Sequence, residues 1–255
     1  MWQGKFARLA LVTLALCTIA ACSGNRSRGS SEPNLAQVYA DMGGAYLQRG
    51  QRDEAREKLQ RALDLDPQLP AAHHYFGELY HQLGQNADAE LHFRKALKLA
   101  PGNPEIRNNY GVFLCDLNKL TEAEEQFALA ISNPDYRTPE LVYENAGRCA
   151  FRNGDTEKAE KYFRSALKLN PNMPNTLCQM ATLNFERGNF LSARAYIQRC
   201  MDAAPPSPQV LWLAVRIERE LQDKTATRKY AKQLKNDFPD AKETNLLIQS
   251  QGSDN

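Results

Sequence analysis

The sequence predicts an all-α protein, a solenoid of six stacked helix–turn–helix units, and three observations support this prediction. Residues 76–101 read as two amphipathic helices joined by a short glycine-containing turn. Ala89, Phe93 and Ala96 lie on one face of the second helix, at spacings of four and three residues. Pro101 cannot continue that helix, so the chain turns back there. The same pattern then recurs with a period of 34 residues along most of the chain.

The recurrence keeps one register for several residue types. Three equivalent positions are occupied by Ala55, Ala123, Ala159 and Ala193, by Leu59, Phe127, Phe163 and Ile197, and by Pro67, Pro171, Pro205 and Pro239. This order resembles the tetratricopeptide repeat, and the resemblance implies a right-handed superhelical solenoid. We expect six units over residues 36–241, namely 36–69, 70–103, 104–137, 140–173, 174–207 and 208–241.

The ends of the repeat array depart from the pattern. The sixth unit has Val215, Thr227 and Ala231 where Gly, Ala and Phe are typical, and we interpret this as decay in a terminal unit without a following neighbour. Residues 242–255 are expected to form a C-terminal tail.

Residues 1–21 have the pattern of a lipoprotein signal peptide. Lys5 and Arg8 supply a basic start, and the apolar stretch that follows is too short for an ordinary membrane helix. The segment ends in Ile19-Ala20-Ala21-Cys22, which resembles the lipobox of bacterial lipoproteins and implies lipidation of Cys22. The alternative is a plain secretory signal in which Cys22 is incidental.

The chain that follows the cleavage site is expected to be held at the outer membrane. Ser23 stands where an Asp would retain a lipoprotein at the inner membrane, so resemblance to lipoprotein sorting implies the periplasmic face of the outer membrane. Residues 22–35 comprise the lipidated cysteine and a tether rich in Ser and Gly.

The charge balance of the mature chain excludes a general attraction to polyanions. Removal of residues 1–21 takes away Lys5 and Arg8, which leaves 30 basic residues against 30 acidic residues. Zero net charge predicts no nucleic-acid partner and no electrostatic attachment to a membrane surface. The lipid is therefore expected to supply the anchoring, and the repeats are expected to lack an exposed basic stripe that could replace it.

Four cysteines remain after Cys22, and an even number in an exported protein suggests disulfides. Cys115 and Cys149 lie at similar heights on the first helices of adjacent units, which favours a bond between them. Cys178 is early in unit five and Cys200 late, so two antiparallel helices bring them together. The alternative is that all four are reduced core residues.

Nothing in the sequence indicates an enzyme, a cofactor or a small-molecule substrate. All four histidines fall in unit two, but only His74 and His81 share a helix face, and no third ligand follows at a metal-site spacing. We expect these histidines to be solvated groove residues. No nucleophile–base pattern, phosphate-binding glycine loop or HExxH pattern occurs.

A concave face formed by the first helices is the expected binding surface. The face is formed chiefly by unit positions two, five, nine, twelve and thirteen. Residues at these positions include His74, Glu78, His81, Asn108, Val112, Asp116, Glu144, Arg148, Phe151, Arg152, Thr182, Phe185, Trp212, Arg216 and Arg219. Arginine and aromatic residues in such a groove favour protein recognition. Several of them, Phe151 and Phe185 above all, could instead pack against the next unit. Ala40 and Gly44 stand where repeats that bind chaperone tails need Lys and Asn.

One part of the chain resembles a narrower family. Residues 105–115 (EIRNNYGVFLC) and 136–147 (YRTPELVYENAG) are similar to the type IV pilus biogenesis lipoprotein, the pilotin of the pilus secretin. The resemblance implies an outer-membrane lipoprotein that binds the secretin subunit and promotes its localisation and multimerisation. Together with the face positions, it makes the protein-binding candidates Asn108, Asn109, Glu144, Arg148, Trp212 and Arg216.

Two other functions remain open on the sequence. The first is a tetratricopeptide lipoprotein of the β-barrel assembly machinery, and the second is a regulator of a periplasmic cell-wall enzyme. Co-purification with a secretin, a barrel-assembly subunit or a cell-wall synthase would separate the three.

Overall fold

The structure is a computed structural model that describes residues 34–252, with side chains to residue 250. The signal peptide, Cys22 and most of the tether lie outside the described residues. Residues Asn34–Asn255 form one compact unit by themselves. Over the described range the chain is helical throughout, without strands, and none of these helices has both the length and the apolar character to cross a membrane.

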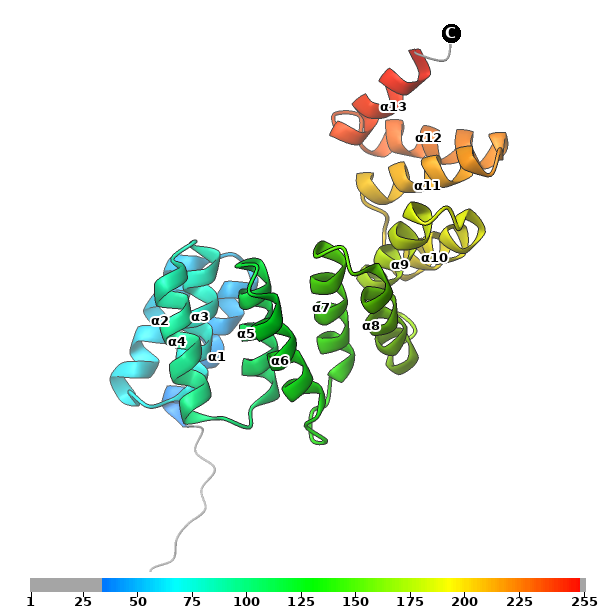
Figure 1. Ribbon diagram of the computed structural model, residues 1–255. Helices are drawn as coiled ribbons and strands as arrows, with labels where there is room; N and C mark the ends of the chain where they lie inside the picture. Colours follow the sequence, from blue (N-terminus) through cyan, green and yellow to red (C-terminus); the bar gives the residue numbers. More distant parts are fainter. Residues whose placement is uncertain (1–33, 253–255) are drawn as a thin grey trace, which may run out of the picture. The chain divides into compact units, whose positions relative to one another are not determined.

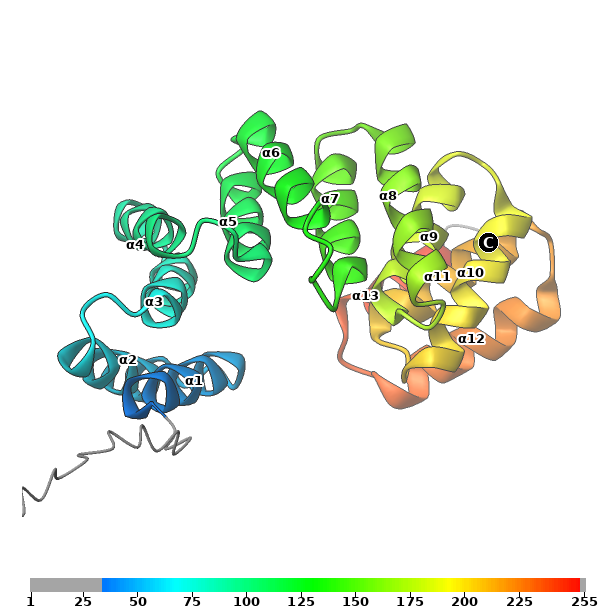
Figure 2. The same ribbon diagram turned by 90° about the horizontal axis from the view of Figure 1, so that it is seen from below.

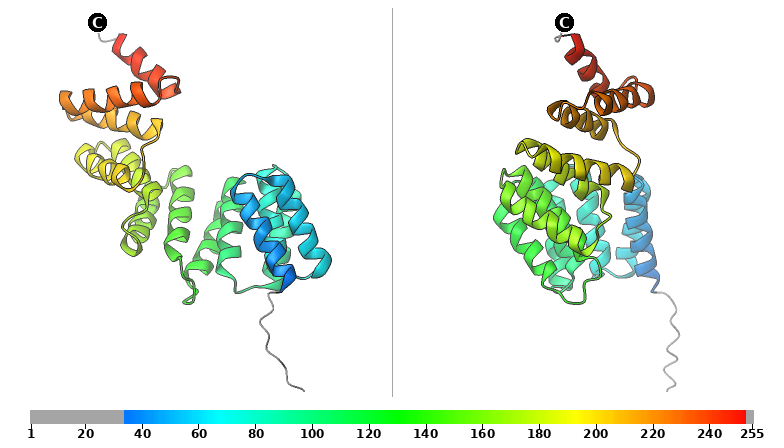
Figure 3. Two further views of the ribbon diagram at one scale, coloured as in Figure 1. Left: turned by 180° about the vertical axis from the view of Figure 1, so that it is seen from behind. Right: turned by 90° about the vertical axis from the view of Figure 1, so that its right-hand side faces the viewer.

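The helices follow one another as six pairs and a final single helix (Figure 1). Their bounds are α1 (Leu35–Gln48), α2 (Arg52–Leu65), α3 (Pro70–Gln82), α4 (Asn86–Leu99), α5 (Pro104–Asp116), α6 (Leu120–Ile131), α7 (Pro139–Arg152), α8 (Thr156–Leu169), α9 (Pro174–Glu186), α10 (Phe190–Ala203), α11 (Pro208–Glu220), α12 (Lys224–Asp237) and α13 (Lys242–Gly252). The two helices of each pair pack closely against each other, and each second helix also contacts the first helix of the next pair. Figures 2 and 3 show the same succession of pairs from other sides. This is the predicted all-α solenoid.

A left-handed residue makes the turn inside every pair. From α3 onward, proline begins the first helix of each pair. In every unit the fifteenth residue lies in the turn between the two helices and has positive φ. The short connection needs positive φ at that residue, which glycine adopts without steric cost. The residues are Gly50 (73°), Gly84 (71°), Asn118 (60°), Gly154 (81°), Gly188 (75°) and Gln222 (58°).

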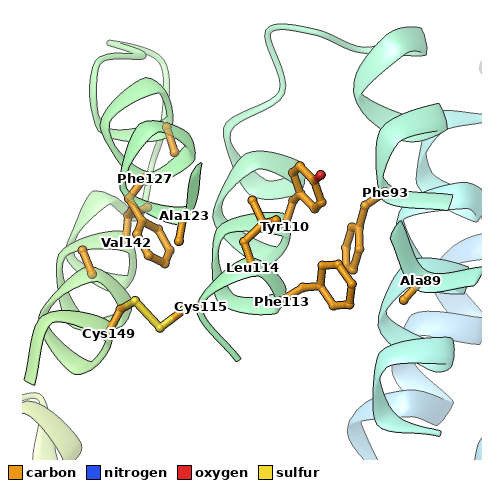
Figure 4. Packing of buried hydrophobic residues seen from close by; sticks show 12 residues of the cluster. Ala89, Phe93, Tyr110, Phe113, Leu114, Cys115, Ala123, Phe127, Val142 and Cys149 are labelled. Atoms are coloured by element: carbon orange, nitrogen blue, oxygen red, sulfur yellow. A yellow bond between two sulfur atoms is a disulfide. The ribbon is translucent and has the colours of Figure 1, made fainter. Parts of the chain in front are cut away.

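Inside each of the first four pairs, a glycine on the first helix faces a large residue on the second. A Cβ atom added to Gly77 would lie 2.9 Å from the Phe93 ring, and one added to Gly147 would lie 2.6 Å from the Phe163 ring. The absence of a side chain therefore lets the ring enter the space between the helices. Figure 4 shows Phe93 in this position, with its ring beside Tyr110 and Phe113 of α5.

The sixth pair corrects the expectation of a decayed terminal unit. Val215 occupies the position of the small residue and Ala231 that of the large one, and both are buried in the same apolar cluster. Unit five is intermediate, with Ala181 facing the position of Ile197. A larger residue on the first helix is thus accompanied by a smaller one on the second.

The end of the chain is also more ordered than expected. Residues assigned to a tail form α13 through Gly252, and this helix packs against α11 and α12. Leu247 is fully buried there, and the hydroxyl of Thr244 donates to the carbonyl of Phe238 at 2.6 Å. The helix covers the apolar edge of the sixth pair, which that pair would otherwise expose.

Helix α12 contradicts the expectation that the repeats lack an exposed basic stripe. Lys224, Arg228, Lys232 and Lys235 recur at spacings of four and three residues and are all exposed, on the side opposite the buried Tyr230. We call the first three of these residues, Lys224, Arg228 and Lys232, the α12 basic row. The expectation failed because a net charge of zero reports the sum of the charges and not their distribution.

Candidate functional site

The first helices α3, α5 and α7 present a continuous polar row. Nδ2 of Asn109 lies 2.8 Å from Nε2 of His74 and also donates to the carboxylate of Glu78. Asn108 donates to Oδ1 of Asn109 at 3.1 Å, and Asn145 donates to Oδ1 of Asn108 at 3.1 Å. The row therefore links three units through side-chain amides. Asn108 is buried within it, whereas Asn109 and Asn145 remain partly exposed.

A second polar row crosses the same helices seven residues, or about two turns, further along. Nε2 of His81 lies 3.2 Å from Oδ2 of Asp116, and Arg152 forms an ion pair with the other oxygen of that carboxylate. Beside it, the disulfide between Cys115 and Cys149 joins α5 to α7 with the Cα atoms 5.9 Å apart (Figure 4). This is the pairing that the repeat register predicted.

A small surface pocket lies over this disulfide. It is lined by Val112, Cys115, Asp116, Asn145, Arg148, Cys149 and Arg152. Asp116 already accepts from Arg152, whereas Arg148 is exposed and has no ion pair within the described residues. The pocket can therefore offer the guanidinium of Arg148 to an acceptor on a partner.

Glu144 occupies an interior position instead. It is buried at 8% exposure and accepts a hydrogen bond from the hydroxyl of Thr176. This bond connects α7 to α9, where no disulfide bridges the first helices. Glu144 thus holds unit four to unit five, and its carboxylate has little surface for a partner.

Units five and six carry the aromatic and cationic part of the face. The guanidinium of Arg216 stands 4.3 Å from the ring centre of Phe185, and that of Arg219 stands 5.6 Å from the ring of Trp212. Arg216 is exposed and Trp212 is half-buried. Guanidinium groups stacked on aromatic rings are held rigid, which lowers the entropy lost when a partner binds.

The second disulfide lies within unit five. Cys178 of α9 is bonded to Cys200 of α10, with the Cα atoms 5.4 Å apart, as the antiparallel arrangement predicted. It joins the two helices of one pair, so it stabilises that pair and not a junction between units.

The histidines correct the expectation of solvated groove residues. His73 and His74 are each only 3% exposed, and His73 packs against His92 of α4. Nδ1 of His73 lies 3.1 Å from Nδ1 of His92, and its Nε2 lies 3.1 Å from the carbonyl of Pro67. A neutral pair satisfies this geometry if His73 donates to Pro67 and His92 donates to His73. Burial lowers the pKa of His73 and lowers that of His92 to about 4, and the neighbouring His73 also contributes to lowering the pKa of His92.

The structure brings only part of the predicted site together. Asn108 and Asn109 lie in the polar row, Arg148 lies in the pocket over the disulfide, and Trp212 and Arg216 form a separate surface on α11. Asn145 was missed by sequence reasoning, although Asn recurs at the sixth position of units three and four. Within the described residues, no group of three or more His, Cys, Asp or Glu side chains could hold a metal ion.

Three family profiles match the chain. One described as TPR repeat covers residues 43–84, and two described as tetratricopeptide repeat cover residues 80–136 and 141–173. The matches span the pairs that carry the polar rows and the Cys115–Cys149 disulfide.

The chain is also similar to proteins of pilus assembly along most of its length. The type IV pilus assembly protein PilF of Pseudomonas aeruginosa strain PAO1 is 29% identical over an alignment of 239 residues, which covers 91% of this chain and 94% of PilF. The crystal structure of PilW, a widely conserved type IV pilus biogenesis factor, has a TM-score of 0.77 at 28% identity, covering 84% of this chain and 98% of PilW. A structure of Pseudomonas aeruginosa PilF has a TM-score of 0.75 at 27% identity, covering 85% and 97%.

Proposed function

We propose that this chain, which matches tetratricopeptide repeat profiles over residues 43–136 and 141–173, acts in type IV pilus biogenesis as a protein-binding scaffold. The observation that carries this proposal is the similarity to PilF over 91% of the chain and 94% of PilF. The similarity to PilW in fold and length supports the same role.

The partner we propose is the secretin subunit of the pilus. Binding would use the exposed members of the first-helix face, Arg148 in the pocket over the disulfide and Arg216 with Trp212 on α11. Arginine and tryptophan dominate many protein interfaces, because one side chain buries a large area and also donates hydrogen bonds. Asn108 and Glu144 would act indirectly, by fixing the spacing of the first helices on which the exposed groups stand.

The proposed place of action is the periplasmic face of the outer membrane. A lipid on Cys22 would hold the repeats there, and the secretin would be bound while it reaches the membrane and forms multimers. The scaffold itself performs no chemistry in this proposal, so its contribution is to position the bound subunit.

The test is complementation of a deletion strain with the double variant Arg148→Ala/Arg216→Ala. Both side chains are exposed, so the variant keeps its core and its disulfides. We expect fewer detergent-resistant secretin multimers, more secretin monomer and reduced piliation. The matched control is Arg56→Ala/Arg61→Ala on the exposed side of α2, which also removes two exposed arginines and should complement fully.

The outcomes separate this proposal from the two alternatives. Normal secretin multimers in the double variant would remove these residues from the binding surface. Normal multimers in the deletion strain itself would remove the proposed function. Co-purification with a barrel-assembly subunit or a cell-wall synthase in place of the secretin would assign the face to that partner.

A further inference from the structure

Nothing inside the fold accounts for the α12 basic row. The helix has five basic residues and one acidic residue, Asp237 at its end. Lys224, Arg228 and Lys232 stand four residues apart, a spacing at which like charges oppose helix formation. Lys224 also lies in the first turn, where the helix dipole disfavours a cation.

The row also lacks the internal partners that other second helices provide. Arg94 pairs with Glu90 at 2.6 Å on α4, and Arg164 pairs with Glu160 at 2.7 Å on α8. In the part of the chain that the structure describes, no carboxylate lies within ion-pair distance of Lys224, Arg228 or Lys232. These charges are therefore available to an external anion.

A pocket at the start of the row is built for such an anion. Its lining consists of Arg219, Gln222, Lys224, Thr227 and Arg228, so three cations meet there. Arg219 is held in place, because it donates to the hydroxyl of Ser250 at 3.0 Å and stacks over Trp212. A phosphate group matches this set, since it accepts several charge-assisted hydrogen bonds at once.

The carboxylate nearest to the pocket in the sequence, Asp223, is already engaged. One of its oxygens accepts from the backbone N–H groups of Thr225 and Ala226, and the other lies 3.4 Å from Arg194. Its charge therefore serves the helix cap and a neighbouring unit, which leaves the pocket cationic.

The row extends well beyond one phosphate. From Lys224 to Lys232 it spans roughly 12 Å at 1.5 Å per residue, so a single small anion in the pocket would not reach Lys232. The adjoining helix α13 exposes Leu246 (37%) and Ile248 (53%). Basic residues beside exposed apolar ones are typical of proteins that lie on a membrane surface.

We propose that α12 binds the surface of an anionic phospholipid membrane, with one phosphate headgroup in the pocket of Arg219, Lys224 and Arg228. This contact is independent of the lipid on Cys22. It would give the repeats a second attachment point at the far end of the described chain, which restricts how they stand relative to the membrane. The attraction acts through exposed charges, so it must weaken as salt is added.

The test uses residues 34–255 without a lipid. The buried core lies entirely within this range, which forms a compact unit of its own, so the fragment folds. Binding is measured by co-sedimentation with vesicles of phosphatidylcholine alone and with vesicles of phosphatidylglycerol and phosphatidylcholine in equal parts. We expect binding to the second kind only, decreasing with salt.

The variant Arg228→Glu/Lys232→Glu should reduce the partition coefficient at least about tenfold, because each basic residue near an anionic surface contributes roughly fivefold. The control Lys161→Glu/Lys168→Glu makes the same change in net charge on exposed residues of α8 and should bind nearly as the parent does. Both variants should melt as the parent does, since all four residues are exposed.

Four results would overturn the proposal. Equal binding of the two variants, or no preference for anionic vesicles, would show that the row is not the contact. Saturable binding of inorganic phosphate that abolishes vesicle binding would reduce the site to a pocket for a small anion. Binding to polyglutamate without binding to vesicles would assign the row to an acidic protein partner.

Discussion

The exchange of large and small residues between the two helices of a unit can be tested by moving it from one unit to another. Unit four has Gly147 against Phe163, and unit five has Ala181 and Ile197 at the same positions. The double variant Gly147→Ala/Phe163→Ile gives unit four the pair found in unit five. Each single variant makes a mismatch that neither unit contains.

The expected magnitudes follow from the packing. In Gly147→Ala the new Cβ would lie 2.6 Å from the Phe163 ring, and such overpacking costs about 1–3 kcal/mol. Against this, replacing glycine by alanine within a helix stabilises it by about 0.5–1 kcal/mol. Phe163 is fully buried, so Phe163→Ile leaves a cavity and also destabilises the fold.

The double variant should be more stable than the sum of the single effects. The alanine methyl group fills space that the smaller side chain vacates, so the overpacking term disappears. We expect a coupling free energy of about 1–3 kcal/mol, measured by urea denaturation of residues 34–255 for the four proteins of the cycle. Effects that add to within about 0.5 kcal/mol would refute the claim that the two positions share one volume.

Four further predictions concern single features. Gln222 has positive φ in the turn before α12, so Gln222→Gly should raise the melting temperature, and Gly84→Gln in the equivalent turn should lower it, each by about 1 kcal/mol of stability. His73 and His92 have lowered pKa values in the fold, so the unfolded chain binds more protons below its ordinary histidine pKa. The contribution of the two histidines to stability is then complete above about pH 6.5, and stability should fall by about 1–2 kcal/mol between that pH and about pH 5. Thermal melts at about pH 6.5 and about pH 5 measure this loss, which should be smaller in His92→Phe. A non-reduced digest analysed by mass spectrometry should contain Cys115 linked to Cys149, and replacing both by Ala should cost about 3–4 kcal/mol because the bond closes a loop with a sequence separation of 34. Cys22→Ala should leave a folded protein that a high-salt wash releases from membranes, and retention in the pellet after that wash would contradict lipidation at Cys22.

The fold could be predicted because its main contact is encoded in one period. Gly77 and Phe93 lie sixteen residues apart, and the same pair of positions returns every 34 residues with matched sizes. The sixth unit was interpreted as decayed because each of its residues was compared separately with the equivalent residues of the other units. Val215 and Ala231 depart from the pattern separately, but together they combine a larger residue on the first helix with a smaller one on the second.

The end of the chain was misread for a different reason. The segment from Lys242 has no period to follow, since it occurs once, and its apolar residues are few. It becomes a helix because α11 and α12 leave an apolar edge against which Leu247 can pack. That edge exists only where the array stops.

The binding face was predictable as a set of positions but not as a set of free side chains. Position counting puts Asn108, Glu144 and Arg148 on the same face. Whether each is available depends on what the neighbouring unit presents at the same height. Glu144 meets the hydroxyl of Thr176, and Asn108 meets the amides on either side of it, so both are used within the protein.

Arg148 has no ion pair within the described residues, so the N–H groups of its exposed guanidinium can donate to a partner protein. The same reasoning applies to the α12 basic row. Glu90 pairs with Arg94 on α4 and Glu160 pairs with Arg164 on α8, whereas the equivalent turn of α12 has no carboxylate. In a repeat protein the neighbouring units supply partners by the same rule at every step. A charged side chain that has no such partner in the described chain is therefore a candidate contact for another molecule. Both proposals rest on side chains of this kind, Arg148 in the first and the α12 basic row in the second.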